Sequence, residues 1–286
     1  MNKPELILSP TDFVAIANQA LEHVFGNVFI EGELSNFRIS KNRWVYFDIK
    51  DDISKVACFG SVYQLPGPLK DGMLVKIGGQ PRLHPQFGFK INFVSITPSG
   101  EGSINKAYEL LRAKLNAEGL FLESRKRSIQ YPPIKIGLIT SNESAAYADF
   151  IKIINNRWPL LEIELYDVQV QGEAAINQII DALTRANKMS DLAEVLVIIR
   201  GGGSSDDLAV FNDERVVRAI AASRIPTFVA IGHEINESLA EMVADKRAST
   251  PSNAAELLVP DKNSELKHLI QQKSILKSLL LNLVNN

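Results

Sequence analysis

The sequence predicts an α+β protein of several domains: a small N-terminal β-barrel, an α/β domain with a mostly parallel sheet, and the start of a helical region. Five strand-like runs lie between residues 28 and 96, separated by turn-rich pieces, which is typical of a small barrel. From residue 134 onwards strand and helix patterns alternate, which predicts parallel strands joined by right-handed crossovers. Residues 262–284 carry leucine and isoleucine at largely helical spacing. We therefore divide the chain into residues 1–100, 101–133, 134–260 and 261–286.

The composition fits a folded protein in a reducing compartment. The chain has 286 residues, of which 45% are hydrophobic, enough for two domains with sizeable cores. Its formal net charge of -2 provides no global basic field, so any contact with nucleic acid has to be local. The single Cys58 excludes an internal disulfide framework, and we find neither a signal peptide nor a membrane span. We predict a cytoplasmic protein that does not enter a membrane.

The first hundred residues predict a helix followed by a barrel with a mixed aromatic and cationic surface. Ser9 and Pro10 open a helical pattern that runs to about Phe25, with Phe13 and Val24 among its packing positions. Small barrels bind single-stranded nucleic acid by combining aromatic rings with cations. The candidate contacts are Phe37, Arg38, Arg43, Trp44, Tyr46 and Phe87, with Lys41, His84 and Lys90 as further ingredients. The alternative is that most of these rings belong to the barrel core.

A helix and a short basic run connect the barrel to the α/β domain. Residues 103–119 have helical spacing and stop at Gly119. Arg125, Lys126 and Arg127 precede a helix-breaking pair of prolines. These cations are either a solvated part of the linker or contacts for phosphate groups, and the sequence leaves both interpretations open.

Two buried strands of the α/β domain are predicted to end in loops that meet at one edge of the sheet. The run Val195–Ile199 leads into Arg200 and a glycine loop, and a helix is predicted from Asp207 to Ala222. The run Thr227–Ile231 is followed closely by His233. Such loops form a crevice, and the amides of a glycine loop at a helix start suit an anion. The candidate phosphate-binding residues are Gly201, Gly202, Gly203 and Ser204.

Two better-known motifs do not fit this stretch. A P-loop needs a lysine after its glycines, and the last glycine of a dinucleotide-binding fingerprint is replaced by Asp206. A zinc protease motif would need histidine where Glu237 stands. The usual nucleotide folds and zinc proteases are therefore not supported. The alternative is that the glycines have a purely structural role and form a tight turn that binds no ligand.

Several motifs, in this order, resemble the family of bacterial exodeoxyribonuclease VII large subunits. They are IGLITS at Ile136–Ser141, RGGGS at Arg200–Ser204, AIGHE at Ala230–Glu234 and TPSNAAEL at Thr250–Leu257. The resemblance implies that the barrel is an OB-fold and that the activity is hydrolysis of phosphodiester bonds in single-stranded DNA. Similar large subunits continue into a long helical region that carries small subunits, of which this chain is expected to retain only the beginning.

The resemblance also implies the identity of the catalytic residues. They match Asp149, Arg200, His233 and Asn236, although similar sequences have aspartate at the last position. Arg200 would hold the phosphate, His233 would act as general acid or base, and Asp149 would orient it or activate water. Because asparagine cannot carry negative charge or accept a proton as a base, either Glu234 or Glu237 replaces the missing carboxylate, or the chain is slow or inactive. Glu241 also stands where similar sequences have aspartate.

Metal dependence and partners follow from the same comparison. No metal spacing is diagnostic, and the resemblance implies that no metal is strictly required, although Asp149, His233 and Glu234 could ligate Mg²⁺. The expected partners are single-stranded DNA and the small exodeoxyribonuclease VII subunit; the apolar face of residues 262–284 suits either such a small subunit or a second copy of the chain, and its length does not choose between them. Two other functions stay open: a single-stranded DNA-binding subunit that has lost catalysis through Asn236, and a small-molecule enzyme that binds a phosphate at the glycine loop.

Overall fold

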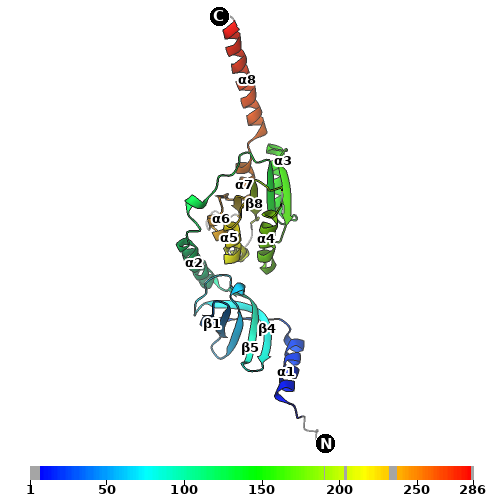
Figure 1. Ribbon diagram of the computed structural model, residues 1–286, viewed down its shortest axis with the longest axis vertical. Coiled ribbons are helices and arrows are strands. Elements are labelled where there is room, and N and C mark those ends of the chain that lie inside the picture. Colours follow the sequence, from blue (N-terminus) through cyan, green and yellow to red (C-terminus); the bar gives the residue numbers. More distant parts are fainter. Residues whose placement is uncertain (1–6, 190, 203–204, 232–236, 285–286) are drawn as a thin grey trace. The chain divides into compact units, whose positions relative to one another are not determined.

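The computed structural model describes residues 7–189, 191–202, 205–231 and 237–284 (Figure 1). The chain divides into two compact units, Met1–Lys114 and Leu115–Asn286. The border between them falls inside helix α2 (Glu101–Ala117), and the rest of the expected connector belongs to the second unit.

The first unit is built on a closed barrel of five strands in the order β1-β2-β3-β5-β4. The strands are β1 (Val28–Ser40), β2 (Trp44–Lys50), β3 (Lys55–Ser61), β4 (Leu74–His84) and β5 (Gly88–Pro98), with the short 3-10 helix η1 (Val62–Gln64) after β3. Neighbouring strands are antiparallel except β3 and β5, which run parallel. This arrangement is the OB-fold, which confirms the predicted fold.

Strict alternation separates the core of the barrel from its surface. Val45, Phe47 and Ile49 of β2 are buried, while Trp44 before them and Tyr46 between them are partly exposed. Helix α2 closes part of the barrel, because Ala107 and Leu110 pack against the core and Leu111 lies against Gly67.

Helix α1 (Pro10–Phe25) is held to the barrel by a polar contact. The side chain of Asn18 donates to the carbonyl of Leu83 and accepts from its amide, at 3.0 and 2.9 Å. Phe13 and Val24 are 57% and 69% exposed, so the prediction that they pack is wrong. The partly buried residues Val14, Ala17, Asn18 and Leu21 lie on the side of the helix that meets β4.

The second unit contains a five-stranded sheet in which every paired strand is parallel, in the order β10-β9-β8-β6-β7. The strands are β6 (Lys135–Thr140), β7 (Glu162–Asp167), β8 (Val195–Ile199), β9 (Thr227–Ala230) and β10 (Lys246–Arg247). Since β6 lies between β7 and β8, the direction of winding reverses between β6 and β8. Ligands in open parallel sheets bind at the carboxyl ends of the strands at this switch point.

Helices surround the sheet, as Figure 1 shows. They are α3 (Ala145–Arg157), α4 (Glu173–Ala186), α5 (Glu214–Ala221), α6 (Leu239–Val243) and α7 (Pro251–Leu258), together with the short 3-10 helix η2 (Glu123–Arg125). Helices α3 and α7 pack against each other, and Phe150, Ile154 and Leu258 from them share one core cluster with Val197 of β8. Helix α4 packs against α5.

The segment after the glycine loop differs from the single helix predicted from Asp207 to Ala222. A 3-10 helix, η3 (Ser205–Asn212), comes first, and α5 begins only at Glu214. Asp213 has an extended backbone with ψ of 129°, and its side chain caps α5 by accepting from the amide of Arg215. An aspartate in this capping geometry starts a new helix and cannot continue the previous one, so the prediction was wrong here.

The last helix, α8 (Lys262–Val284), follows Pro260. Six of its apolar side chains are more than half exposed: Leu266, Leu269, Ile270, Ile275, Leu276 and Leu280. Within the described part of the chain, we find no helix with the length and hydropathy that a membrane span requires.

Candidate functional site

The glycine loop after β8 lies against the first turn of α3. A Cβ atom added to Gly201 would meet the Cβ of Ala146 at 3.4 Å, so the glycine loop and the first turn of α3 are in contact there. The side chain of Ser144 caps α3 by accepting from the amide of Tyr147 at 3.1 Å, and its hydroxyl donates to the carbonyl of Ser141 at 2.7 Å. The loops after β6 and β8 are therefore packed together at the switch point of the sheet.

Asp149 lies on the same side of α3 as this contact. It follows Ala146 by three residues, which places it one helical turn further along the same face. Its side chain is exposed, whereas Ala146 and Phe150 are buried. Asp149 is therefore an exposed carboxylate one helical turn beyond the contact between Ala146 and Gly201.

Two buried polar side chains stand at the carboxyl ends of the same two strands. Arg200, directly after β8, is only 2% exposed, and its backbone amide donates to the carbonyl of Ala230 at 3.2 Å. Thr140, the last residue of β6, is fully buried, and its hydroxyl has no hydrogen-bond partner among the described residues. Buried polar groups are normally satisfied, so this hydroxyl marks a place where a ligand or a water molecule fits.

The remaining predicted site residues fall outside the described residues. These are Gly203, Ser204, His233, Glu234 and Asn236. Glu237 is described and forms an ion pair with Arg247 at 3.2 Å. Of the predicted catalytic and phosphate-binding residues, the structure therefore places Asp149, Arg200, Gly201 and Gly202.

The barrel carries a connected strip of aromatic rings and cations. Trp44 stacks on Phe59 at 5.3 Å between ring centroids, and Phe59 lies 5.1 Å from Tyr46. The guanidinium of Arg43 lies 4.8 Å from the centre of the Trp44 ring, and that of Arg38 lies 5.4 Å from the centre of Tyr46. Lys90 links the strip to the β4–β5 turn, since its Nζ lies 5.4 Å from the Tyr46 ring and 5.5 Å from the Phe87 ring. We call Trp44, Tyr46, Phe59 and Phe87 with these cations the aromatic strip.

The aromatic strip contains Phe59, which was not among the residues predicted to contact DNA, and it does not contain Phe37, which was. Phe59 lies opposite Tyr46 in the β2–β3 register, and the buried Cys58 before it signals that Phe59 points outward. Phe37 instead packs against the barrel core, with its ring 6.3 Å from Phe47. The structure thus gives Phe37 a packing role.

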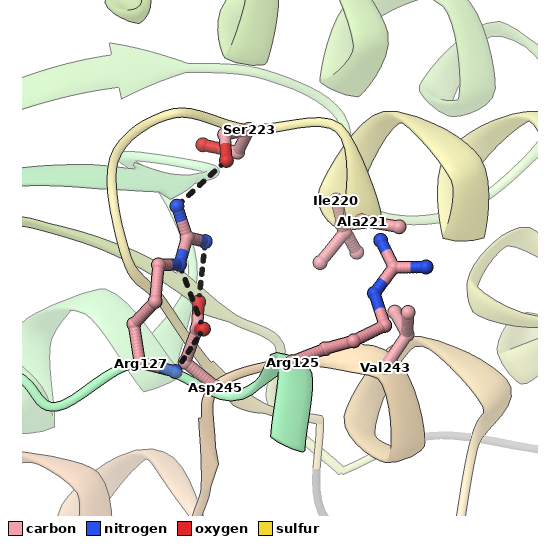
Figure 2. A pocket seen from close by; sticks show the side chains of 7 residues that line it. All are labelled: Arg125, Arg127, Ile220, Ala221, Ser223, Val243 and Asp245. Atoms are coloured by element: carbon pink, nitrogen blue, oxygen red, sulfur yellow. Dashed lines mark hydrogen bonds and ion pairs between the residues drawn. The ribbon is translucent and has the colours of Figure 1, made fainter. Parts of the chain in front are cut away.

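The basic run 125–127 does not form a single cationic surface. Arg127 donates to Asp245 and to the carbonyls of Ser223, Arg224 and Ile225. Lys126 forms an ion pair with Glu123 at 2.8 Å. Figure 2 shows Arg127 held between Ser223 and Asp245, while Arg125 lines the other side of a pocket of about 220 Å³.

This pocket lies at the opposite edge of the sheet from the glycine loop. Asp245 accepts from the amide of Thr227, the first residue of β9, so the pocket is at the amino ends of the strands. The Arg127 side chain therefore stabilises this edge of the fold, and it is not available to hold a phosphate at the switch point.

Metal ligands do not gather in the described part of the molecule. Among these residues there is no group of three or more histidine, cysteine, aspartate or glutamate side chains that could hold a metal ion.

Two family models cover nearly the whole chain. One, described as exonuclease VII, large subunit, matches residues 120–286, and the other, described as an OB-fold nucleic acid binding domain, matches residues 11–97. The chain belongs to the exonuclease VII large subunit family. The second match agrees with the closed barrel, and the first covers the sheet with its switch point.

Curated relatives agree with this membership. The exodeoxyribonuclease 7 large subunit of Pseudomonas entomophila is 38% identical over 277 residues, which are 95% of this chain and 60% of that protein. The one of Streptococcus gordonii is 42% identical over 252 residues, which are 86% of this chain and 56% of that protein. The chain thus spans about three fifths of the length of these relatives. Among solved structures, a match to a chain of a replication protein A heterotrimer bound to ssDNA covers 32% of this chain and 72% of that chain. The sequence identity is 13% and the TM-score is 0.23, so this likeness carries no argument about function.

Proposed function

We propose that this chain acts as the large subunit of an exodeoxyribonuclease VII and hydrolyses phosphodiester bonds of single-stranded DNA. The observation that carries the proposal is the buried Arg200 beside a glycine loop at the switch point of the sheet, in a chain of this family. A guanidinium suits paired phosphate oxygens, and the backbone amides of a glycine loop add further donors. The aromatic strip of the barrel supports the choice of a single-stranded substrate.

The proposed hydrolysis uses three side chains. Arg200 holds the scissile phosphate, Asp149 accepts a proton from water, and the water oxygen forms the new bond to phosphorus. His233 donates a proton to the leaving oxygen as the old phosphorus–oxygen bond breaks. Because Glu237 is engaged by Arg247 and Asn236 cannot act as a base, we assign the first step to Asp149.

The proposed partners follow from the exposed surfaces. The apolar side chains of α8 suit a helical partner, either a small subunit of this enzyme or a second copy of the chain. The single buried Cys58 suits a reducing compartment, so we propose a cytoplasmic location. We propose that no metal is strictly required, with Mg²⁺ as the ion to test.

A second function rests on one residue only. Asn236 stands where the family resemblance predicts aspartate, so the chain could bind single-stranded DNA without cutting it. Tight binding without cleavage distinguishes this function from the first one.

Substitution within the aromatic strip tests the substrate. We expect Tyr46→Ala to weaken the binding of a single-stranded oligonucleotide by about 1–3 kcal/mol, since it removes a stacking surface shared by two cations. The matched control is Phe29→Ala, which removes an exposed ring under Lys76 on another part of the barrel. Fluorescence anisotropy with a labelled oligonucleotide measures both, and equal losses in the two variants contradict the assignment of the strip.

Cleavage of single-stranded DNA labelled separately at each end tests the chemistry. The chain is assayed with and without a small subunit of its family, beside His233→Ala and Asn236→Asp. We expect the unmodified chain to cleave and His233→Ala to lose this activity. If only Asn236→Asp cleaves, the second function is correct; if none of the three cleaves in either condition, the proposed active site is wrong.

A further inference from the structure

Glu241 occupies an unusual position for a charged residue. It lies on the short helix α6 and is only 5% exposed. Its carboxylate accepts hydrogen bonds from the amide of Ser238 at 2.9 Å and the hydroxyl of Ser238 at 2.8 Å. It also accepts a longer bond, at 3.4 Å, from the amide of Ile231. A buried carboxylate is costly unless such donors compensate it, so its place is set by these partners.

The partners of Glu241 lie on both sides of the segment that carries His233. Ile231 is the residue that directly follows β9, and Ser238 is the cap residue of α6. One side chain therefore joins Ile231 and Ser238, the two residues that flank residues 232–237 in the sequence. A capping box involves only Ser238 and Glu241. The hydrogen bond from the amide of Ile231 is therefore an additional contact of Glu241 that the cap does not require.

A second side chain holds the same turn from the direction of the glycine loop. The carbonyl oxygen of the Asn212 side chain accepts from the amide of Leu239 at 2.9 Å. Asn212 ends η3, the element that follows the glycine loop. Asn212 and Glu241 thus connect the chain after β8, the end of β9 and the start of α6.

We propose that Glu241 is a positioning residue for the active site, and that it fixes the ends of the segment 232–237 with Asn212 as its support. This inference rests on the proposed function, in which His233 donates a proton. A proton donor displaced by about 1 Å can cost about 100-fold in rate, so a clamp at both ends of its segment matters for catalysis. The role differs from that of Arg200, since Glu241 acts through the backbone of Ile231 and Ser238 and does not contact the phosphate.

The test compares Glu241→Gln with Glu241→Asp in the full chain. Glutamine keeps the size but has only one acceptor oxygen, so it cannot accept hydrogen bonds from both Ile231 and Ser238. We expect the single-turnover cleavage rate at saturating DNA to fall about 100-fold, while the KM and the affinity for DNA stay unchanged. Aspartate keeps the acceptors and should restore part of the rate. Glu256→Gln, on the exposed face of α7, is the control and should keep the full rate.

Hydrogen exchange provides a readout that does not depend on activity. In Glu241→Gln, the amide of Ile231 or that of Ser238 should exchange faster, while those of β6 and β8 remain protected. Asn212→Ala should raise exchange at Leu239, which keeps the test valid if Glu241→Gln does not fold. Unchanged exchange at Ile231 and Ser238 overturns the clamp, and faster exchange with an unchanged cleavage rate overturns the positioning role. If the unmodified chain does not cleave, the proposed function fails and hydrogen exchange alone decides on the clamp.

Discussion

Asp245 illustrates how one buried carboxylate can organise an edge of a sheet. Its side chain is 5% exposed and accepts from Arg127 and from the amide and hydroxyl of Thr227. Burial by itself raises the pKa of Asp245, but the hydrogen bonds from Arg127 and Thr227 outweigh it and hold this pKa below its ordinary value. The linker before β6 is thereby tied to the starts of β9 and β10.

The hydrogen bonds of Asp245 with Arg127 and Thr227 predict a contribution to stability that depends on pH. We expect Asp245→Asn to lower the free energy of unfolding by about 3 kcal/mol at pH 7, because Arg127 loses its charged partner. A lowered folded-state pKa contributes stability above the unfolded pKa of about 3.9, and this contribution disappears as the pH falls through the folded-state value. The difference between the variant and the unmodified chain should therefore shrink at low pH.

Urea unfolding at pH 7 and at pH 3 measures this difference. Fluorescence of Trp158, in a Trp44→Phe background, reports on the second unit. Arg125→Gln is the matched control, since Arg125 lines the same pocket and is not one of the hydrogen-bond partners described for Asp245. Equal destabilisation by Asp245→Asn at both pH values contradicts the role given to the carboxylate.

At the scale of elements, local patterns predicted the strands well and the breaks between helices less well. The alternation in β2 is visible in the sequence because neighbouring side chains point to opposite sides. The break between η3 and α5 was missed because it depends on hydrogen bonds of the side chains there. Asn212 accepts from the amide of the distant Leu239, and Asp213 accepts from the amide of Arg215 in the next turn. The outward position of Phe59 depends on cross-strand pairing with Tyr46, which one strand alone does not reveal.

Helix α2 yields a prediction at this scale, because it works as part of the barrel as well as a connector. Ala107 and Leu110 cover the barrel core, and the hydroxyl of Ser103 accepts from the amide of Leu74 at 2.9 Å. A chain of residues 1–117 should therefore fold and bind single-stranded DNA. A chain of residues 1–100 should be less stable by about 3 kcal/mol, since several apolar side chains lose their cover.

Thermal unfolding followed by circular dichroism compares the two fragments. Equal midpoints would show that α2 contributes nothing to the barrel. A fragment 1–117 that does not fold would contradict its independence from the second unit.

At the scale of the whole molecule, the proposed function assigns DNA binding to the barrel and hydrolysis to the parallel sheet. The motif around Arg200 predicts a phosphate site at the carboxyl end of β8, because a strand that leads into a glycine loop suits an anion, and this site stays a prediction. The sequence also suggested an OB-fold, which the closed barrel confirms. The clamp at Glu241 could not be predicted, because it depends on where the ends of β9 and α6 meet in space.

The most direct test of the central claim is the rate at which the chain cleaves labelled single-stranded DNA when Arg200 is replaced. Arg200→Ala removes the phosphate contact, and Arg200→Met keeps the buried stem as a control for packing. We predict that both variants remain folded, retain DNA binding through the aromatic strip and cleave about 100- to 1000-fold more slowly than the unmodified chain. A folded Arg200→Ala variant that cleaves at the unmodified rate would contradict the account.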